Sequence, residues 1–133
     1  MYITKEDVKK ATGIKPDDLG LETENDLNDL IDKWITQATN LINEDRNRDY
    51  AKEVTAGKRD EVPPGIENIC ERLVANIIAR AILRRETPIV KNDDFEVSMT
   101  SDEVFTGSIK SDLARYPMKP SLGFFRVGGS NED

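Results

Sequence analysis

One apolar stretch, residues 62–86, constrains the fold of this chain more than any other part of the sequence. Its apolar residues recur three and four positions apart, the spacing that gathers side chains on one face of a helix. Pro63 and Pro64 suit a first helical turn, and the pair Thr87-Pro88 ends the pattern. Additional apolar residues widen the face beyond a single stripe. We therefore predict a helix that is covered on more than one side and is central to the fold.

A second helical stripe occupies residues 24–43. Its apolar residues keep register through about five turns, and acidic residues in the first turn suit the helix dipole. Each stripe needs an apolar partner, so we expect two long antiparallel helices packed on each other. The predicted core residues are Leu27, Leu30, Ile31, Trp34, Ile35, Ala38 and Leu41 in this stripe and Ile69, Leu73, Val74, Ile77 and Ala81 in the stripe of residues 62–86.

The chain of 133 residues is most simply one domain, with a helical part over residues 1–116 and a C-terminal tail over residues 117–133. Residues 44–61 are polar and mixed in charge, which predicts a charged loop between the long helices, after up to two further turns of the first of them. A connection of this length is either mobile or used for contacts, and a solvated loop is the favoured interpretation. Apolar and polar residues alternate after position 95, which predicts a short β excursion over about 95–110. The predicted fold class is therefore mainly α, a small helical bundle with a short β excursion and a flexible C-terminal tail.

The C-terminal tail combines glycine, proline and polar residues with a short apolar run. Linkers seldom carry two adjacent aromatic residues, so we expect the tail to dock on a partner. The candidate partner-binding residues are Leu122, Phe124, Phe125, Arg126 and Val127.

The charge and composition exclude several classes of function. The chain has 26 acidic residues against 19 basic ones, a formal net charge of −7, and no histidine. It is therefore a poor candidate for a dedicated DNA or RNA binder, and it lacks the commonest general base and transition-metal ligand. The single cysteine, Cys70, lies on an apolar stripe, so we expect a buried, inert thiol and a reducing cytoplasm. No apolar run is long enough for a membrane span, and no signal peptide is expected.

No pattern in the sequence indicates an active site. Adjacent carboxylate pairs at residues 17–18, 44–45 and 93–94 lack the spacing of a calcium-binding loop, so we interpret them as solvated charge. The patterns of P-loops, dinucleotide-binding turns and nucleophile elbows do not occur. We therefore expect no catalytic residue, no metal and no cofactor, and an enzyme is the least favoured class.

The order of features resembles the head–tail connector, or head-completion, proteins of long-tailed bacteriophages and prophages. These proteins open with a short helix, continue with a long acidic and apolar helix, and follow it with a proline-initiated helix that has a charged end. A short β-type segment and a small last helix complete the family's order. The matching segments here are Ile3–Lys9, Leu27–Ile42 with Ala38, Val62-Pro63-Pro64, Arg84-Arg85-Glu86, Phe95–Thr100 and Leu113–Tyr116.

The resemblance implies a virion protein of the head–tail junction that is assembled in the host cytoplasm. Such subunits form a ring, dodecameric in the virion, beneath the portal protein. The ring extends the DNA channel, docks a tail-side completion or stopper protein, and lets duplex DNA pass without tight binding. A different class, a small cytoplasmic regulatory or antitoxin-like helical binding protein, also fits the residues.

Overall fold

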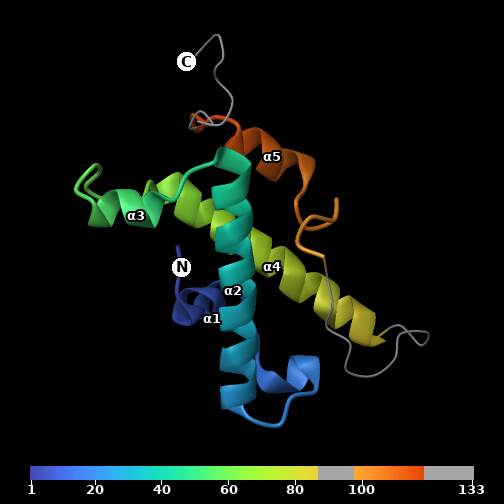
Figure 1. The fold of residues 1–133 in the computed structure, drawn as a ribbon. Helices are drawn as coiled ribbons and strands as arrows, with labels where there is room; N and C mark the ends of the chain where they lie inside the picture. Colours follow the sequence, from blue (N-terminus) through green and yellow to red (C-terminus); the bar gives the residue numbers. More distant parts are fainter. Residues whose placement is uncertain (87–97, 119–133) are drawn as a thin grey trace.

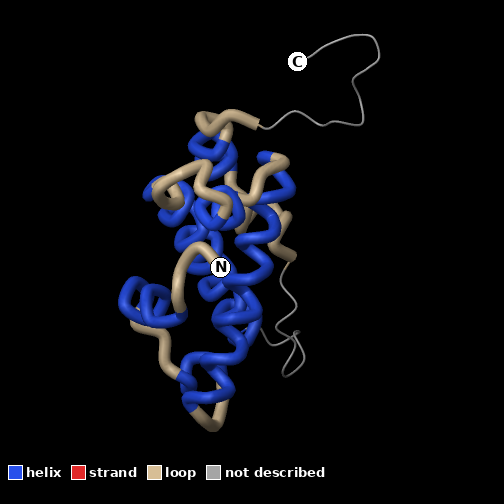
Figure 2. Tube along the Cα trace, turned by 60° about the vertical axis from the view of Figure 1, so that its left-hand side comes forward, coloured by secondary structure: helices blue, strands red, loops and turns tan. Residues whose placement is uncertain are grey.

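The computed structural model describes residues 1–86 and 98–118, and this part of the chain is mainly helical, as the sequence predicted (Figure 1). Figure 2 shows helices and loops in these two ranges, and no strand is present in them. The elements are α1 (Lys5–Thr12), the 3-10 helix η1 (Pro16–Leu19), α2 (Glu24–Arg46), α3 (Tyr50–Thr55), α4 (Pro64–Glu86) and α5 (Gly107–Leu113).

Helix α4 lies at the centre of the fold, where it contacts α1, η1, α2 and α5. This is the position predicted for a helix with apolar residues on more than one side. Its buried residues are Ile66, Ile69, Cys70, Leu73, Val74, Ile77, Ile78 and Ala81. Burial of each large side chain contributes about 1.5–3 kcal/mol before the loss of chain entropy is subtracted.

Helices α2 and α4 each contain 23 residues and pack on each other. Figure 1 shows α4 passing obliquely across α2, so the predicted antiparallel alignment of the two helices is not confirmed. Ten of the twelve predicted core residues are buried, and the other two, Leu30 and Leu41, are partly buried against the core. Only 2% of the surface of Trp34 is exposed to solvent. The apolar stripe of α2 therefore faces the core along the central part of the helix.

The predicted loop over residues 44–61 contains helical structure instead. Helix α2 continues to Arg46, Asn47 takes a left-handed conformation with φ 51°, and α3 follows. Asp49 starts α3 by accepting a hydrogen bond from the Lys52 N–H at 3.1 Å. A local cap and one buried aromatic residue, Tyr50, therefore help to hold this polar segment on the domain.

The predicted β excursion is wrong over the part that the structure describes. Residues 98–106 form turns, in which the Ser101 carbonyl accepts hydrogen bonds from the N–H groups of Val104 and Phe105. Both side chains are buried, and Asn76 of α4 donates to the Val104 carbonyl at 3.0 Å. Packing against α4 thus decides the conformation here. The first residues of the predicted excursion, Phe95 to Val97, lie outside the described residues.

Replacing Leu73 by alanine tests the central position of α4. Leu73 has no exposed surface, so we expect Leu73→Ala to lower the free energy of unfolding by about 2–5 kcal/mol. Leu83 on the same helix is 50% exposed, and Leu83→Ala is a matched control that should cost less than about 1 kcal/mol. Urea unfolding followed by circular dichroism measures both, and equal costs would contradict a central α4.

Candidate functional site

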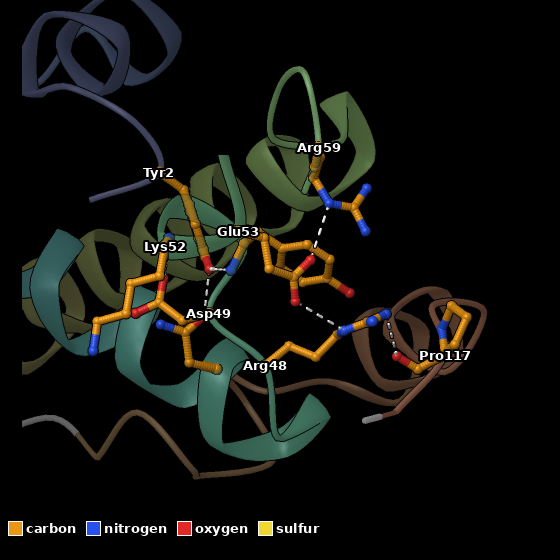
Figure 3. Close-up of polar contacts among 9 residues, drawn as sticks. Tyr2, Arg48, Asp49, Lys52, Glu53, Arg59 and Pro117 are labelled. Carbon is orange, nitrogen blue, oxygen red and sulfur yellow. Dashed lines mark hydrogen bonds and ion pairs between the residues drawn. The ribbon is translucent and has the colours of Figure 1, made fainter. Parts of the chain in front are cut away.

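Four residues of the segment after α2 form what we call the arginine cluster: Arg48, Tyr50, Glu53 and Arg59. The Nε atoms of Arg48 and Arg59 donate to the two Glu53 carboxylate oxygens at 3.2 and 3.1 Å (Figure 3). Both guanidinium groups also lie over the Tyr50 ring, 5.8 and 5.0 Å from its centroid. The carboxylate balances one of the two cations, so the arginine cluster keeps a net positive charge.

Tyr2 joins the arginine cluster to the N-terminal residues. Its hydroxyl donates to the Asn43 side-chain oxygen of α2 and accepts from the Tyr50 backbone N–H at 3.0 Å (Figure 3). The Tyr2 and Tyr50 rings meet edge to face with centroids 6.3 Å apart. The Tyr2 backbone N–H donates to the Thr39 hydroxyl at 3.3 Å. The first residues of the chain, α2 and α3 are therefore held together at one point.

Two arginines, one of which belongs to the arginine cluster, also hold the C-terminal end of the described domain. Arg46 donates to the Tyr116 carbonyl at 2.9 Å, and Arg48 donates to the Pro117 carbonyl at 3.3 Å. Tyr116 also packs closely on the first turn of α4, where Gly65 leaves no room for a Cβ atom beside the Tyr116 hydroxyl. Two arginines and a glycine thus fix the point from which residues 119–133 continue.

The opposite end of α2 carries most of the excess negative charge. We call this region the acidic end. It comprises Asp17, Asp18, Glu22, Glu24, Asp26, Asp29 and Asp32, and no basic residue occurs between positions 16 and 32. Among the described ion pairs, Lys9 contacts Glu24 at 2.6 Å and Lys5 contacts Asp32 at 3.9 Å.

An apolar hollow lies within the acidic end, and we call it the α2 hollow. It has a volume of about 360 Å³ and is lined by Leu21, Asp26, Asp29, Leu30 and Lys33. Leu21 and Leu30 are partly buried and continue into the core, whereas both aspartates are exposed. The hollow therefore has an apolar floor and a mostly acidic rim.

Cys70 lies in the α2–α4 contact, with its sulfur 3.8 Å from the Thr39 hydroxyl. Burial raises the pKa of the thiol to about 11, while the Thr39 contact opposes that rise. The thiol is therefore protonated near neutral pH and poorly reactive, as expected from its place on an apolar stripe. Among the described residues no group of three or more acidic, cysteine or histidine side chains could hold a metal ion. No described helix has both the length and the apolar character to cross a membrane.

The five predicted partner-binding residues, Leu122, Phe124, Phe125, Arg126 and Val127, lie outside the described residues. Sequence reasoning missed the arginine cluster because it lies in the segment interpreted as a solvated loop. The signal that could have revealed it is Tyr50, an isolated aromatic residue between two arginines in a polar segment.

Comparison with known proteins gives no relative from which a function could be transferred. The chain matches no protein-family model, no curated protein and no solved structure. The residues and their geometry are thus the starting point for a functional proposal.

Replacing Tyr2 by phenylalanine should make the protein less stable and change how its stability depends on pH. The substitution leaves the buried Tyr50 N–H without its acceptor, at a cost of about 1–3 kcal/mol. Burial raises the Tyr2 pKa from 10.0 to about 12. The contribution of the neutral Tyr2 hydroxyl to the free energy of unfolding is therefore complete below pH 10 and is lost as the pH rises through 12. Urea midpoints measured from pH 7 to 12 should therefore fall less steeply above pH 10 in Tyr2→Phe than in the unmodified protein.

The buried Cys70 thiol should cause part of the alkaline decline in both proteins, because its pKa is also raised. Tyr116→Phe, which removes the hydroxyl of another tyrosine, is the matched control and is measured over the same pH range. A Tyr2→Phe protein whose stability falls as steeply as that of the control would contradict this role for the Tyr2 hydroxyl.

Proposed function

We propose that this protein is a structural assembly subunit, built on the long helices α2 and α4, that acts through contacts with other subunits. More specifically, we propose that it is a head–tail connector protein of a long-tailed bacteriophage or prophage. Its ring, dodecameric in the virion, would lie between the portal and a tail-side completion or stopper protein.

The observation that carries this proposal is the order of the helices. A short helix capped by Thr4 and Asp7 comes first, and the long α2 follows after η1. The second long helix, α4, starts at Pro64 after the proline pair, and the short α5 comes last. This is the order in which the sequence resembles the connector family, with turns in place of the family's β-type segment over the described residues 98–106.

The fixed starting point of the tail also supports the proposal. The carbonyls of Tyr116 and Pro117 are held by Arg46 and Arg48, so the residues that follow leave the domain at a defined position. A segment that starts from a rigid anchor loses less freedom on binding than one that starts from a mobile loop. The segment Leu122 to Val127 then starts from a fixed point when it contacts a partner subunit.

The charge of the chain is consistent with a channel through which DNA passes. Affinity for duplex DNA depends on cations that neutralise phosphates, and this chain has 26 acidic against 19 basic residues. Basic residues of α4 and α5 are paired with acids: Arg72 contacts Asp112 at 2.6 Å, and Lys110 contacts Asp102 at 3.7 Å. Such pairing reduces the positive charge available to grip phosphates.

Deleting the tail tests the proposed assembly role. Removing residues 119–133 should leave the melting temperature of the domain nearly unchanged, because the anchoring carbonyls of Tyr116 and Pro117 remain. We expect the truncated subunit to be lost from particles, with heads that fail to retain packaged DNA. Removing only residues 130–133 is the control and should allow normal incorporation. Truncated subunits that still assemble and retain DNA would rule out this use of the tail.

A gel-shift series over salt concentration separates the connector from a DNA-binding regulator. We expect no retention of duplex DNA by the isolated protein near physiological salt, because its average field repels phosphates. Submicromolar binding with a steep salt dependence would instead favour the regulatory class. A basic DNA-binding domain run in the same buffers provides the positive control.

A further inference from the structure

The α2 hollow is an apolar surface with two aspartates and one lysine, Lys33, on its rim, and the part of the tail before Glu132 is positively charged. Asp26 and Asp29 on its rim belong to the acidic end, in which seven acidic residues occur without a basic one between positions 16 and 32. The tail has Lys119 and Arg126 and no acidic residue before Glu132. An aromatic side chain followed by arginine therefore complements this hollow in both polarity and charge.

The size of the α2 hollow suits a side chain of the tail. Its volume of about 360 Å³ lies within the range of pockets that bind small ligands, which begins at roughly 300 Å³. Leu21 and Leu30 provide the apolar floor for an aromatic ring. Asp29 on the rim is exposed and can pair with a guanidinium beside that ring.

The geometry of the chain favours a tail that comes from another copy. The described chain ends close to the C-terminal end of α2, where Arg46 holds the Tyr116 carbonyl and where Figure 1 shows α5 beside α2. The residues of α2 that line the hollow belong to the N-terminal half of that helix. Leu30 and Arg46 are sixteen residues apart, about 24 Å along the helix axis. The eight residues from Pro117 to Phe124 are joined by seven steps, which span at most about 25 Å when the chain is fully stretched. The tail would have to lie completely extended along its own α2 to reach its own hollow.

We infer that Phe124, Phe125 and Arg126 of one copy dock in the α2 hollow of the next copy. An aromatic ring contacts Leu21 and Leu30, and Arg126 pairs with the aspartates of the rim. This contact joins two different surfaces, so it is head-to-tail, and successive contacts of this kind close into a ring when the rotation between copies allows it. The inference deepens the proposed function, because it names the partner of the tail as a second copy of this chain.

Photo-crosslinking of the full chain tests the location of the tail. Unlabelled protein carrying Phe124→benzoylphenylalanine is mixed with an excess of ¹⁵N-labelled protein that has no crosslinker, and the products are mapped by mass spectrometry. We expect the unlabelled tail to be joined to labelled residues between 21 and 33. Three outcomes would each overturn the inference: crosslinks within one copy, crosslinks to another surface such as α3, or no crosslink at about 100 µM protein. That concentration is roughly a hundredfold above a micromolar dissociation constant.

A charge exchange tests the pairing itself. We expect Asp29→Arg and Arg126→Asp each to weaken self-association about tenfold or more, measured by analytical ultracentrifugation, and the double variant to recover most of the loss. Asp17→Arg makes the same charge change at an exposed position of the acidic end that does not line the hollow, so it should have little effect. A double variant no better than the single ones, or a control as weak as Asp29→Arg, would overturn the inference.

These experiments can fail without the proposed function failing. They use purified protein and measure the contact between copies, whereas the role at the head–tail junction is measured by incorporation into particles. A protein that is incorporated and retains DNA in the head, but whose tail does not crosslink to the α2 hollow, would remain a connector with a different contact between subunits.

Discussion

Helix α4 buries side chains against four other elements, and this shared burial is the constraint on which the rest of the structure depends. α1, η1, α2 and α5 each contact α4, so each covers a different part of one apolar surface. Leu73, Val74 and Ile77 have no exposed surface. A polar substitution at these positions would therefore disturb several contacts at once rather than one helix pair. The turns at 98–106 follow the same rule, since Val104 and Phe105 take the conformation that packs on α4.

A polar network sets the position of both ends of the described domain. Tyr2 reaches Asn43 and the Tyr50 N–H, while Arg46 and Arg48 hold the carbonyls of residues 116 and 117. All these contacts lie at the junction of α2 and α3. Of these hydrogen bonds only that of the Tyr50 N–H to Tyr2 is buried, and its loss would leave an unsatisfied donor in the core. The domain therefore presents the start of its tail in one defined place.

In the proposed assembly, the distribution of charge along α2 distinguishes the two ends of the subunit. The acidic end surrounds the apolar α2 hollow, and the tail leaves near the other end of the helix with two cations and two aromatic residues. Complementary surfaces at opposite ends of a subunit favour head-to-tail association over symmetric pairing. A ring built in this way would need no additional domain, because each copy supplies both halves of the contact.

The sequence by itself determined the two long helices and most of the core, because burial imposes a period of 3.6 that is visible without coordinates. The stripes of residues 24–43 and 62–86 therefore predicted α2, α4 and the inward position of Trp34 correctly. The alternation after position 95 carried less information, and over residues 98–106 the chain forms turns in which Val104 and Phe105 are buried. Only the tertiary structure brought Tyr2 to Tyr50 and Arg46 to Tyr116, contacts that are 48 and 70 residues apart along the chain. Their positions depend on how α4 orients the other helices, and no local pattern in the sequence encodes that orientation.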